Sequence, residues 1–191
     1  MSILLTEHEQ ERLIQVARDS VIHGLETGEP GTCCLSDCPD SFRRNAACFV
    51  TLYYRRRLRG CIGTIQERRP LVQDVSLNAY KAAFQDPRFE PMKQSELNHL
   101  KFQISVLGGR QPVLYVDELD LLDQINPGWG IELTFGEQRG LLLPAVWKKI
   151  GDKRQFWRVL KEKAGLPPDF WSDEFTVTRF RAVSFGEVPD V

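Results

Sequence analysis

Cys61 is the cysteine whose neighbours in the sequence most favour chemistry. It lies in the segment Leu58–Thr64, which reads LRGCIGT, next to Arg59 and between Gly60 and Gly63. A nearby guanidinium group favours the thiolate, which is the reactive form of cysteine. Glycines let a substrate approach the backbone, whose N–H groups can bind an oxyanion or a phosphate. The segment predicts a nucleophilic or redox thiol, and the alternative is a buried cysteine that packs like alanine.

A second candidate segment is Asp86-Pro87-Arg88-Phe89. An aspartate before proline is typical of an Asx turn. The guanidinium of Arg88 can form a bidentate contact with a bound carboxylate or phosphate, or with Asp86 itself. We therefore expect Arg59 and Arg88 to bind the negative group of a ligand, and Asp86 to orient Arg88. The alternative interpretation is a structural clamp within a loop.

The positive charge of the chain is concentrated around these segments. The 191 residues carry a formal net charge of −1, yet residues 43–69 hold eight arginines and a single acid, Glu67. A nearly neutral chain argues against a dedicated nucleic-acid-binding protein. The arginine-rich segment can still attract an anion. Nucleotide or RNA binding, which would show steep salt dependence, is the weaker alternative for the same segment.

The sequence predicts neither a metal site nor a cofactor. Cys33, Cys34 and Cys38 lack the usual C-x2-C pairs and are one thiol short of a closed zinc site. The chain contains neither a phosphate-binding P-loop motif nor a G-x-G-x-x-G motif. Five cysteines without an export signal predict reduced thiols and a cytoplasmic location.

Cys61 is predicted to lie on the second arm of a β-hairpin. Residues 47–54 are rich in β-branched and aromatic types and predict a strand. Arg55-Arg56-Arg57 then form a polar turn, and residues 58–65 return as the second strand. Glycine inside a strand usually marks a bulge or a close approach by another group.

Helices and further strands surround this hairpin. Thr6 and Glu9 form a capping box at the start of an amphipathic helix over residues 7–26, which a loop over 28–46 follows. The other predicted elements are a helix that starts at Pro70 and ends before Asp86, a short helix near 94–100, a strand over 101–107, a hairpin over 131–143, a helix capped by Asp152 and a final strand near 175–180. The pattern over 116–125 fits either a turn of helix or an edge strand. Because hairpins force antiparallel pairing, the predicted fold class is α+β, with a mainly antiparallel sheet and flanking helices in a single domain over residues 1–191.

Several of these segments together resemble the AMMECR family, which is named for the Alport syndrome, midface hypoplasia and elliptocytosis chromosomal region. The similarity is carried by residues 49–52, 58–64, 82–89 and 104–107, and later by 128–131, 142–146 and 163–167, so that it extends over about residues 7–185. It implies a larger sheet-and-helix part, a smaller lobe and a cleft between them. It also implies that Arg59, Gly60, Cys61, Asp86 and Arg88 belong to the characteristic surface of the family. The segment with Cys33, Cys34 and Cys38 is not part of the family pattern.

Two hypotheses of different classes follow. The first is a cytoplasmic domain with an anion-accepting cleft near Cys61, where Gly60 and Gly63 allow close approach of the ligand; this domain is an enzyme only if the thiol reacts. The second is a non-catalytic partner or scaffold. Bacterial and archaeal members of the family are called AmmeMemoRadiSam system protein A and are grouped with a MEMO-type protein and a radical SAM enzyme. The resemblance implies no particular reaction, and the sequence identifies no general base for Cys61.

Overall fold

The chain adopts an α+β fold with a six-stranded sheet. The computed structural model describes residues 5–187, and its strands are hydrogen-bonded in the order β2-β1-β3-β6-β4-β5. They are β1 (Cys48–Tyr54), β2 (Arg57–Gly63), β3 (Leu100–Pro112), β4 (Gly130–Phe135), β5 (Gln138–Leu142) and β6 (Thr176–Gly186). The pairings of β1 with β2 and β3, and of β4 with β5 and β6, are antiparallel. The predicted fold class and the antiparallel sheet are therefore confirmed.

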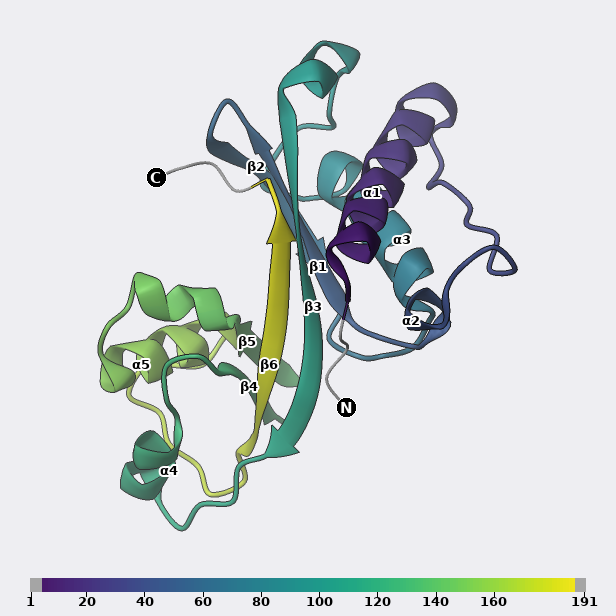
Figure 1. Cartoon of the computed structure of the whole chain (residues 1–191). Helices are drawn as coiled ribbons and strands as arrows, with labels where there is room; N and C mark the ends of the chain where they lie inside the picture. Colours follow the sequence, from purple (N-terminus) through teal and green to yellow (C-terminus); the bar gives the residue numbers. More distant parts are fainter. Residues whose placement is uncertain (1–4, 188–191) are drawn as a thin grey trace. The chain divides into compact units, whose positions relative to one another are not determined.

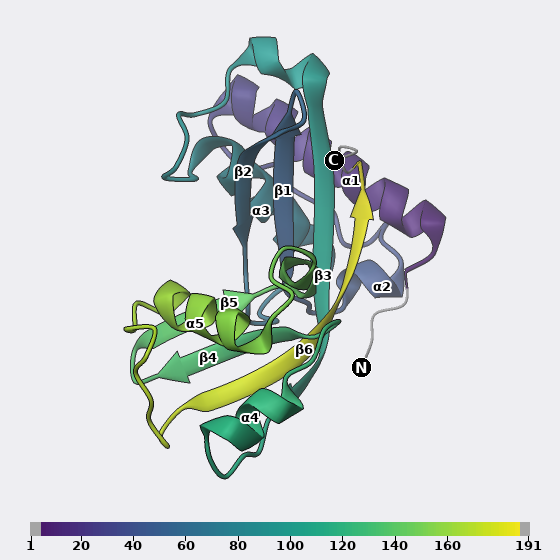
Figure 2. The same ribbon diagram turned by 90° about the vertical axis from the view of Figure 1, so that its left-hand side faces the viewer.

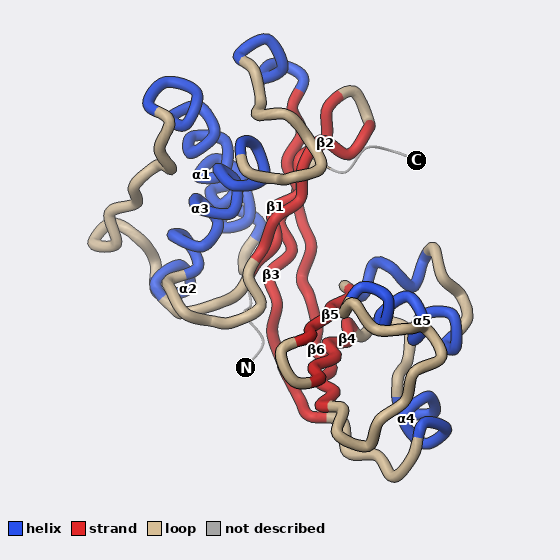
Figure 3. The backbone as a smooth tube through the Cα atoms, turned by 180° about the vertical axis from the view of Figure 1, so that it is seen from behind, coloured by secondary structure: helices blue, strands red, loops and turns tan. Residues whose placement is uncertain are grey.

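The described residues divide into two compact units. We call residues 5–107 with 183–187 the N-terminal unit, and residues 108–182 the central unit. In the N-terminal unit, helices α1 (Glu7–Thr27) and α3 (Leu71–Phe84) lie on one side of β1, β2 and β3 (Figure 1). Figure 3 shows the same arrangement from behind. No helix among residues 5–187 has both the length and the apolar composition needed to cross a bilayer.

The core of the N-terminal unit forms where these helices meet the strands. Most of its fully buried side chains come from α1, α3, β1 and β3, and they include Leu13, Val21, Val50, Leu52, Leu71, Val75, Phe102 and Ile104. Each such side chain contributes about 1.5–3 kcal/mol through removal from water. This burial places one face of β1 and β2 against helices and leaves Phe49, Thr51 and Cys61 on their other face.

Helix α1 begins and ends as the sequence predicts. The Thr6 hydroxyl accepts the Glu9 N–H at 3.3 Å, and the Glu9 carboxylate accepts the Thr6 N–H at 2.8 Å, which confirms the capping box. Gly28 ends the helix in the left-handed conformation. The prediction of a continuous loop over 28–46 was wrong, because α2 (Asp40–Arg43) forms one helical turn that buries Phe42.

The hairpin of β1 and β2 has a tighter turn than predicted. Arg57 pairs with Tyr54, so the turn contains only Arg55 and Arg56, with φ of 49° and 68°. Positive φ at both central residues matches the twist that a two-residue hairpin requires. Strand β2 also ends at Gly63, two residues earlier than expected, because the chain turns there toward α3.

A bulge interrupts the ladder close to this turn. Leu52 pairs with Gly60 and Tyr53 pairs with Leu58, so Arg59 is an extra residue without a partner on β1. A bulge bends its strand and gives the extra side chain a new direction. The glycine-containing arm therefore contains the irregularity that its sequence predicted.

The central unit contains the second predicted hairpin, β4 and β5, beside which helix α5 (Lys153–Lys163) packs (Figure 2). Asp152 caps α5 through the Gln155 N–H at 2.7 Å, as predicted. The ambiguous segment over 116–125 forms helix α4 (Glu118–Gln124), because the Asp117 carboxylate accepts the Asp120 N–H at 2.8 Å. Two 3-10 helices complete the elements: η1 (Gln94–His99), close to the predicted short helix, and η2 (Pro144–Lys148), which was not predicted.

Strand β3 runs five residues farther than the predicted strand over 101–107. The extension includes Arg110, whose guanidinium pairs with the buried Glu132 carboxylate on β4. Arg139 on β5 pairs with the same carboxylate. The buried acid is thus paired with two arginines, one from β3 and one from β5, as a charge inside a protein requires.

Gly60 provides a stability test of the fold. A Cβ atom at Gly60 would lie 2.0 Å from the backbone oxygen of Ala82, whereas one at Gly151 would meet nothing within 4 Å. We expect Gly60→Ala to lower the free energy of unfolding by about 2–3 kcal/mol, because α3 and β2 must separate. Gly151→Ala should change it by less than about 0.5 kcal/mol. Urea denaturation measures both values, and equal effects would contradict the close contact of β2 with α3.

Candidate functional site

Cys61 lies in the middle of β2, the edge strand of the sheet, and its side chain is partly exposed. The neighbouring Gly60 faces Ala82 on α3. Because alternate residues of a strand point to opposite faces, the Cys61 thiol points away from this helix. Thr51 is its partner on β1, and the Thr51 hydroxyl donates to Cys61 Sγ at 3.2 Å. The thiol therefore lies beside Thr51, on the face of β1 and β2 that points away from the helices.

A tyrosine lies on the same face close to the thiol. The Tyr53 hydroxyl donates to Gln103 Oε1 at 3.2 Å. Burial, and to a smaller extent the negative charge of a Cys61 thiolate, raise the pKa of Tyr53. Tyr53 is therefore a neutral phenol at physiological pH, which can donate a hydrogen bond but does not act as a base. The sequence analysis did not single out Thr51 or Tyr53, because their proximity to Cys61 depends on strand register.

The structure brings the two predicted motifs together at the outer edge of β2. The Cys61 N–H donates to Asp86 Oδ2 at 2.8 Å, and Arg88 Nη2 donates to the Cys61 carbonyl at 3.2 Å. Arg88 also forms a bidentate contact with Asp86, with distances of 2.9 Å from Nε and 2.6 Å from Nη2. One acceptor and one donor thus pair with the backbone of Cys61 as a neighbouring strand would. An edge strand otherwise presents these groups for pairing with another chain.

The ion pair between Asp86 and Arg88 is asymmetric in exposure. The Asp86 side chain is 2% exposed and that of Arg88 is 54% exposed. Hydrogen bonds from Arg88 outweigh the effect of burial and lower the pKa of Asp86 to about 2. The contact with Asp86 likewise raises the pKa of Arg88. Both groups are therefore charged at neutral pH, and the arginine is held in place while much of its surface stays in water.

Arg59, which we expect to bind the negative group of a ligand together with Arg88, pairs with an acid of the protein. The bulge directs it toward Glu96, which it contacts at 2.7 Å from Nε and at 3.0 Å from Nη2. These contacts lower the pKa of Glu96 and offset the charge of Arg59. Nη1 of Arg59 is buried and has no hydrogen-bond partner among residues 5–187. Its role in anion binding stays a prediction, since only this nitrogen is left without an acceptor.

The two glycines of the motif lie in close contact with other parts of the unit. The Ala82 backbone occupies the position that a Cβ atom at Gly60 would need. A Cβ atom at Gly63 would lie 2.3 Å from the ring of Phe49. Packing alone is therefore sufficient to require glycine at both positions. The expectation that a ligand approaches the backbone at Gly60 and Gly63 stays a prediction.

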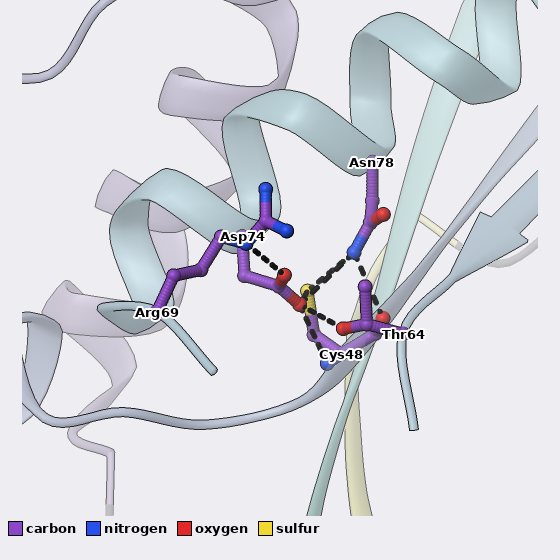
Figure 4. Close-up of polar contacts among 5 residues, drawn as sticks. All are labelled: Cys48, Thr64, Arg69, Asp74 and Asn78. Carbon is purple, nitrogen blue, oxygen red and sulfur yellow. Dashed lines mark hydrogen bonds and ion pairs between the residues drawn. The ribbon is translucent and has the colours of Figure 1, made fainter. Parts of the chain in front are cut away.

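A second polar cluster is buried where α3 meets the start of β1 and the end of β2 (Figure 4). Asp74, on α3, is 1% exposed. Its Oδ2 atom accepts the Cys48 N–H at 3.1 Å and Asn78 Nδ2 at 3.0 Å, together with the Thr64 hydroxyl and the Cys48 thiol. Arg69 Nε lies 3.4 Å from Asp74 Oδ1. The cluster joins the start of β1 and the end of β2 to α3.

This second cluster is a structural group rather than a reactive one. Burial, and then the charge of Asp74, raise the pKa of Cys48 well above its ordinary value, so its thiol stays protonated. The sequence analysis did not identify Asp74 or Asn78. Their signal is two polar residues four positions apart on the buried side of a helix, and such residues need partners inside the protein. Among residues 5–187, no group of three or more potential ligands is placed to hold a metal ion.

Comparisons with known proteins agree with this fold. The family model described as AMMECR1 matches residues 14–185. The chain is similar to a protein of Methanothermobacter thermautotrophicus, with 37% identity over 186 residues and 96% of each chain covered. It is also similar to a protein of Methanopyrus kandleri, with 36% identity and coverage of 96% of this chain and 90% of the relative. The crystal structure of an uncharacterized protein from Pyrococcus horikoshii superposes with a TM-score of 0.88 at 32% identity, covering 96% of this chain and 93% of the other. The names of these proteins state no activity.

The ion pair of Asp86 makes a pH-dependent contribution to stability. In the unfolded chain an aspartate has a pKa of about 3.9. Because the folded pKa is lower, the pair stabilises the fold above about pH 4, and this contribution is lost as the pH falls toward 2. We expect Asp86→Asn to lower the free energy of unfolding by about 2 kcal/mol at pH 7. The difference from the unmodified protein should shrink between pH 4 and pH 2.

Urea unfolding at a series of pH values measures this difference. Asp40→Asn is the matched control, because Asp40 also pairs with an arginine but its side chain is 80% exposed. The control should change the free energy of unfolding by less than about 1 kcal/mol. A penalty for Asp86→Asn that is the same at every pH would contradict the assigned ion pair.

Proposed function

The chain belongs to the AMMECR1 family, and from this premise we propose that it binds a small anionic ligand at the outer edge of β2, beside Cys61 and Arg88. The cleft that the resemblance implies stays a prediction. The proposed site does not require this cleft, because its residues Cys61, Asp86 and Arg88 all lie in the N-terminal unit.

The observation that carries the proposal is the guanidinium of Arg88. It is held by Asp86 and by the Cys61 carbonyl, yet more than half of its side chain is exposed. Its hydrogen bonds within residues 5–187 use Nε and Nη2, which leaves Nη1 for an added acceptor. A cation that is already held in place loses little freedom on binding, which favours affinity. Carboxylate and phosphate are the groups that an arginine side chain binds best.

The Cys61 thiol is the group at this site that can react with a bound ligand. The Thr51 hydroxyl donates to its sulfur at 3.2 Å, and Arg88 is held beside the same residue by the Cys61 carbonyl. The sulfur of a cysteine is nucleophilic as the thiolate. An anionic ligand with an electrophilic atom would therefore meet a nucleophile at Cys61, and a ligand without one would only bind.

Alkylation of Cys61 tests this proposal. Iodoacetate carries a carboxylate and iodoacetamide does not, so their relative rates at one thiol report the effect of a nearby cation. We expect Cys61 to favour iodoacetate over iodoacetamide, relative to a free thiol, by about fivefold, because Arg88 attracts the carboxylate. Arg88→Ala should remove this preference, and Arg88→Lys should restore part of it. Mass spectrometry of the digested protein gives the rate for each cysteine.

Cys48 is the internal control, because it is fully buried and should react only after unfolding. Arg68→Ala is the matched variant. It removes an exposed arginine from the arginine-rich segment 43–69, which contains Cys61, and leaves Arg88 in place. The proposal fails if Arg88→Ala and Arg68→Ala have equal effects. It also fails if Cys61 reacts only in denatured protein, since a ligand would then have no access to the thiol.

The turn of the same hairpin favours a second function, as a docking surface for an acidic protein. Arg55 and Arg56 both have positive φ, which costs roughly 1 kcal/mol or more for each residue that is not glycine. Asn-Gly would fit the turn better. Both arginines are exposed. A function that requires their positive charge would explain why arginines occupy these unfavourable positions. The partner we propose is a MEMO-type protein or a radical SAM enzyme.

Replacing the turn residues separates the cost of positive φ from the contribution of the arginine charges to binding. We expect the double variant Arg55→Asn, Arg56→Gly to raise the free energy of unfolding by about 1 kcal/mol, because Asn and Gly accept positive φ more readily. It should also weaken binding to the MEMO-type protein of the same genome at least tenfold. Urea denaturation and a pull-down between purified proteins measure the two changes, with Arg88→Ala as the control that leaves the turn intact. Unchanged binding would reject the docking surface.

A further inference from the structure

A cavity of about 450 Å³ lies in the N-terminal unit, away from the Cys61 edge. It is formed by α1, by the segment 31–38 and by the first turns of α3. Its lining contains three thiols, those of Cys33, Cys34 and Cys38. None of the functions considered above uses this cavity, and its size is sufficient for a small ligand.

The three thiols differ in exposure and in their contacts. Cys34 is exposed, and its sulfur lies 3.0 Å from the Ser36 hydroxyl oxygen. The partly exposed Cys38 donates its thiol to the backbone carbonyl of Cys34 at 3.3 Å, so the Cys38 sulfur lies beside the Cys34 backbone. Cys33 is partly buried, and its thiol points toward the Val72 carbonyl at 3.9 Å. Cys34 is therefore the accessible thiol, and Cys38 is a second thiol nearby.

Charged groups of both signs line the same cavity. Arg12 and His23 come from α1 and bring a guanidinium and an imidazole group, whereas Asp19 and Asp37 are acids. The Ser36 hydroxyl donates to Asp37 Oδ1 at 3.0 Å. A lining with both signs fits a ligand that carries an ammonium and a carboxylate group. Amino-acid and peptide thiols, and their disulfides, have this character and also react with cysteine.

We propose that this cavity binds the disulfide of a small zwitterionic thiol and that Cys34 and Cys38 reduce it. Cys34 is the attacking residue, because it is the exposed thiol and its contacts with the side chain and backbone of Ser36 lower its pKa, whereas burial raises the pKa of Cys33. A thiolate is the species that attacks a disulfide.

The exchange has two steps. In the first, the Cys34 thiolate attacks one sulfur of the disulfide RSSR, the S–S bond of the ligand breaks, and RS⁻ leaves and takes a proton from water. In the second, Cys38 loses its proton to solvent and attacks Cys34 Sγ, which releases the other RS⁻. Two protein thiols are thereby oxidised to one protein disulfide, and RSSR is reduced to two molecules of RSH.

Glutathione disulfide and the uncharged bis(2-hydroxyethyl) disulfide are the two probes. The experiment uses the full chain with Cys61→Ser, so that the edge site does not contribute. We expect glutathione disulfide to release two molecules of glutathione per chain and to leave a Cys34–Cys38 disulfide. Cys38→Ser should stop at one glutathione bound to Cys34, and Cys34→Ser should abolish the reaction at this segment. Intact-mass and peptide mass spectrometry distinguish these products.

A second comparison tests the cavity itself. Arg12→Gln and Asp19→Asn should each slow the reaction with glutathione disulfide by about fivefold, with little effect on the uncharged disulfide. Far-UV circular dichroism shows whether each variant is folded. Because the two variants change different residues of the same helix, the test can still be made if one of them does not fold. Equal rates for both probes in all proteins would mean an exposed thiol without a binding site and would overturn the proposal. Failure of Cys34 to form any mixed disulfide would overturn it as well.

Discussion

The buried carboxylate of Asp74 is the interaction on which the geometry around Cys61 depends. It accepts hydrogen bonds from the first residue of β1, from Thr64 just after β2 and from Asn78 on its own helix. A carboxylate in such a place is stable only when donors surround it, because an unpaired buried charge is very unfavourable. Asp74 therefore joins both ends of the hairpin to α3. The contact of Gly60 with Ala82 fixes the same strand a few residues away. Together these contacts determine where the Cys61 backbone lies.

The edge of β2 shows how one set of contacts can serve both stability and function. Asp86 and Arg88 pair with the N–H and the carbonyl of Cys61, which removes two groups that would otherwise be open to another strand. The same pairing holds the guanidinium of Arg88 at the surface with its charge retained. A clamp within the protein and an anion site are therefore compatible, because the clamp uses only some of the N–H groups of the arginine.

The five cysteines show that burial decides what a thiol can do. Cys48 is enclosed among polar partners and stays protonated, whereas Cys34 is exposed next to hydroxyl and backbone donors. Cys61 lies between these extremes, partly exposed beside Thr51 on the sheet face away from the helices. The local sequence predicts a strand for Cys48 and a loop for Cys34, but the exposure of each sulfur depends on which elements cover it. The chain thus carries two accessible thiol environments, at Cys61 and at Cys34, that differ in their neighbours.

The sequence by itself determined the class of fold and most of the elements, though not α2, η2 or the full length of β3, because these depend largely on interactions between near neighbours. The capping box of Thr6, the hairpin turn after Tyr54 and the α+β pattern are local, and so is the contact of Asp86 with Arg88, which lie two residues apart. Only the tertiary structure decided that Arg59 pairs with Glu96, that Thr51 donates to Cys61 and that Asp74 gathers donors from three elements. These partners are distant in sequence, and strand register, a bulge and helix packing bring them together. A side chain's type limits the chemistry it can perform, but its charge, exposure and reach are set by partners that only the folded chain supplies.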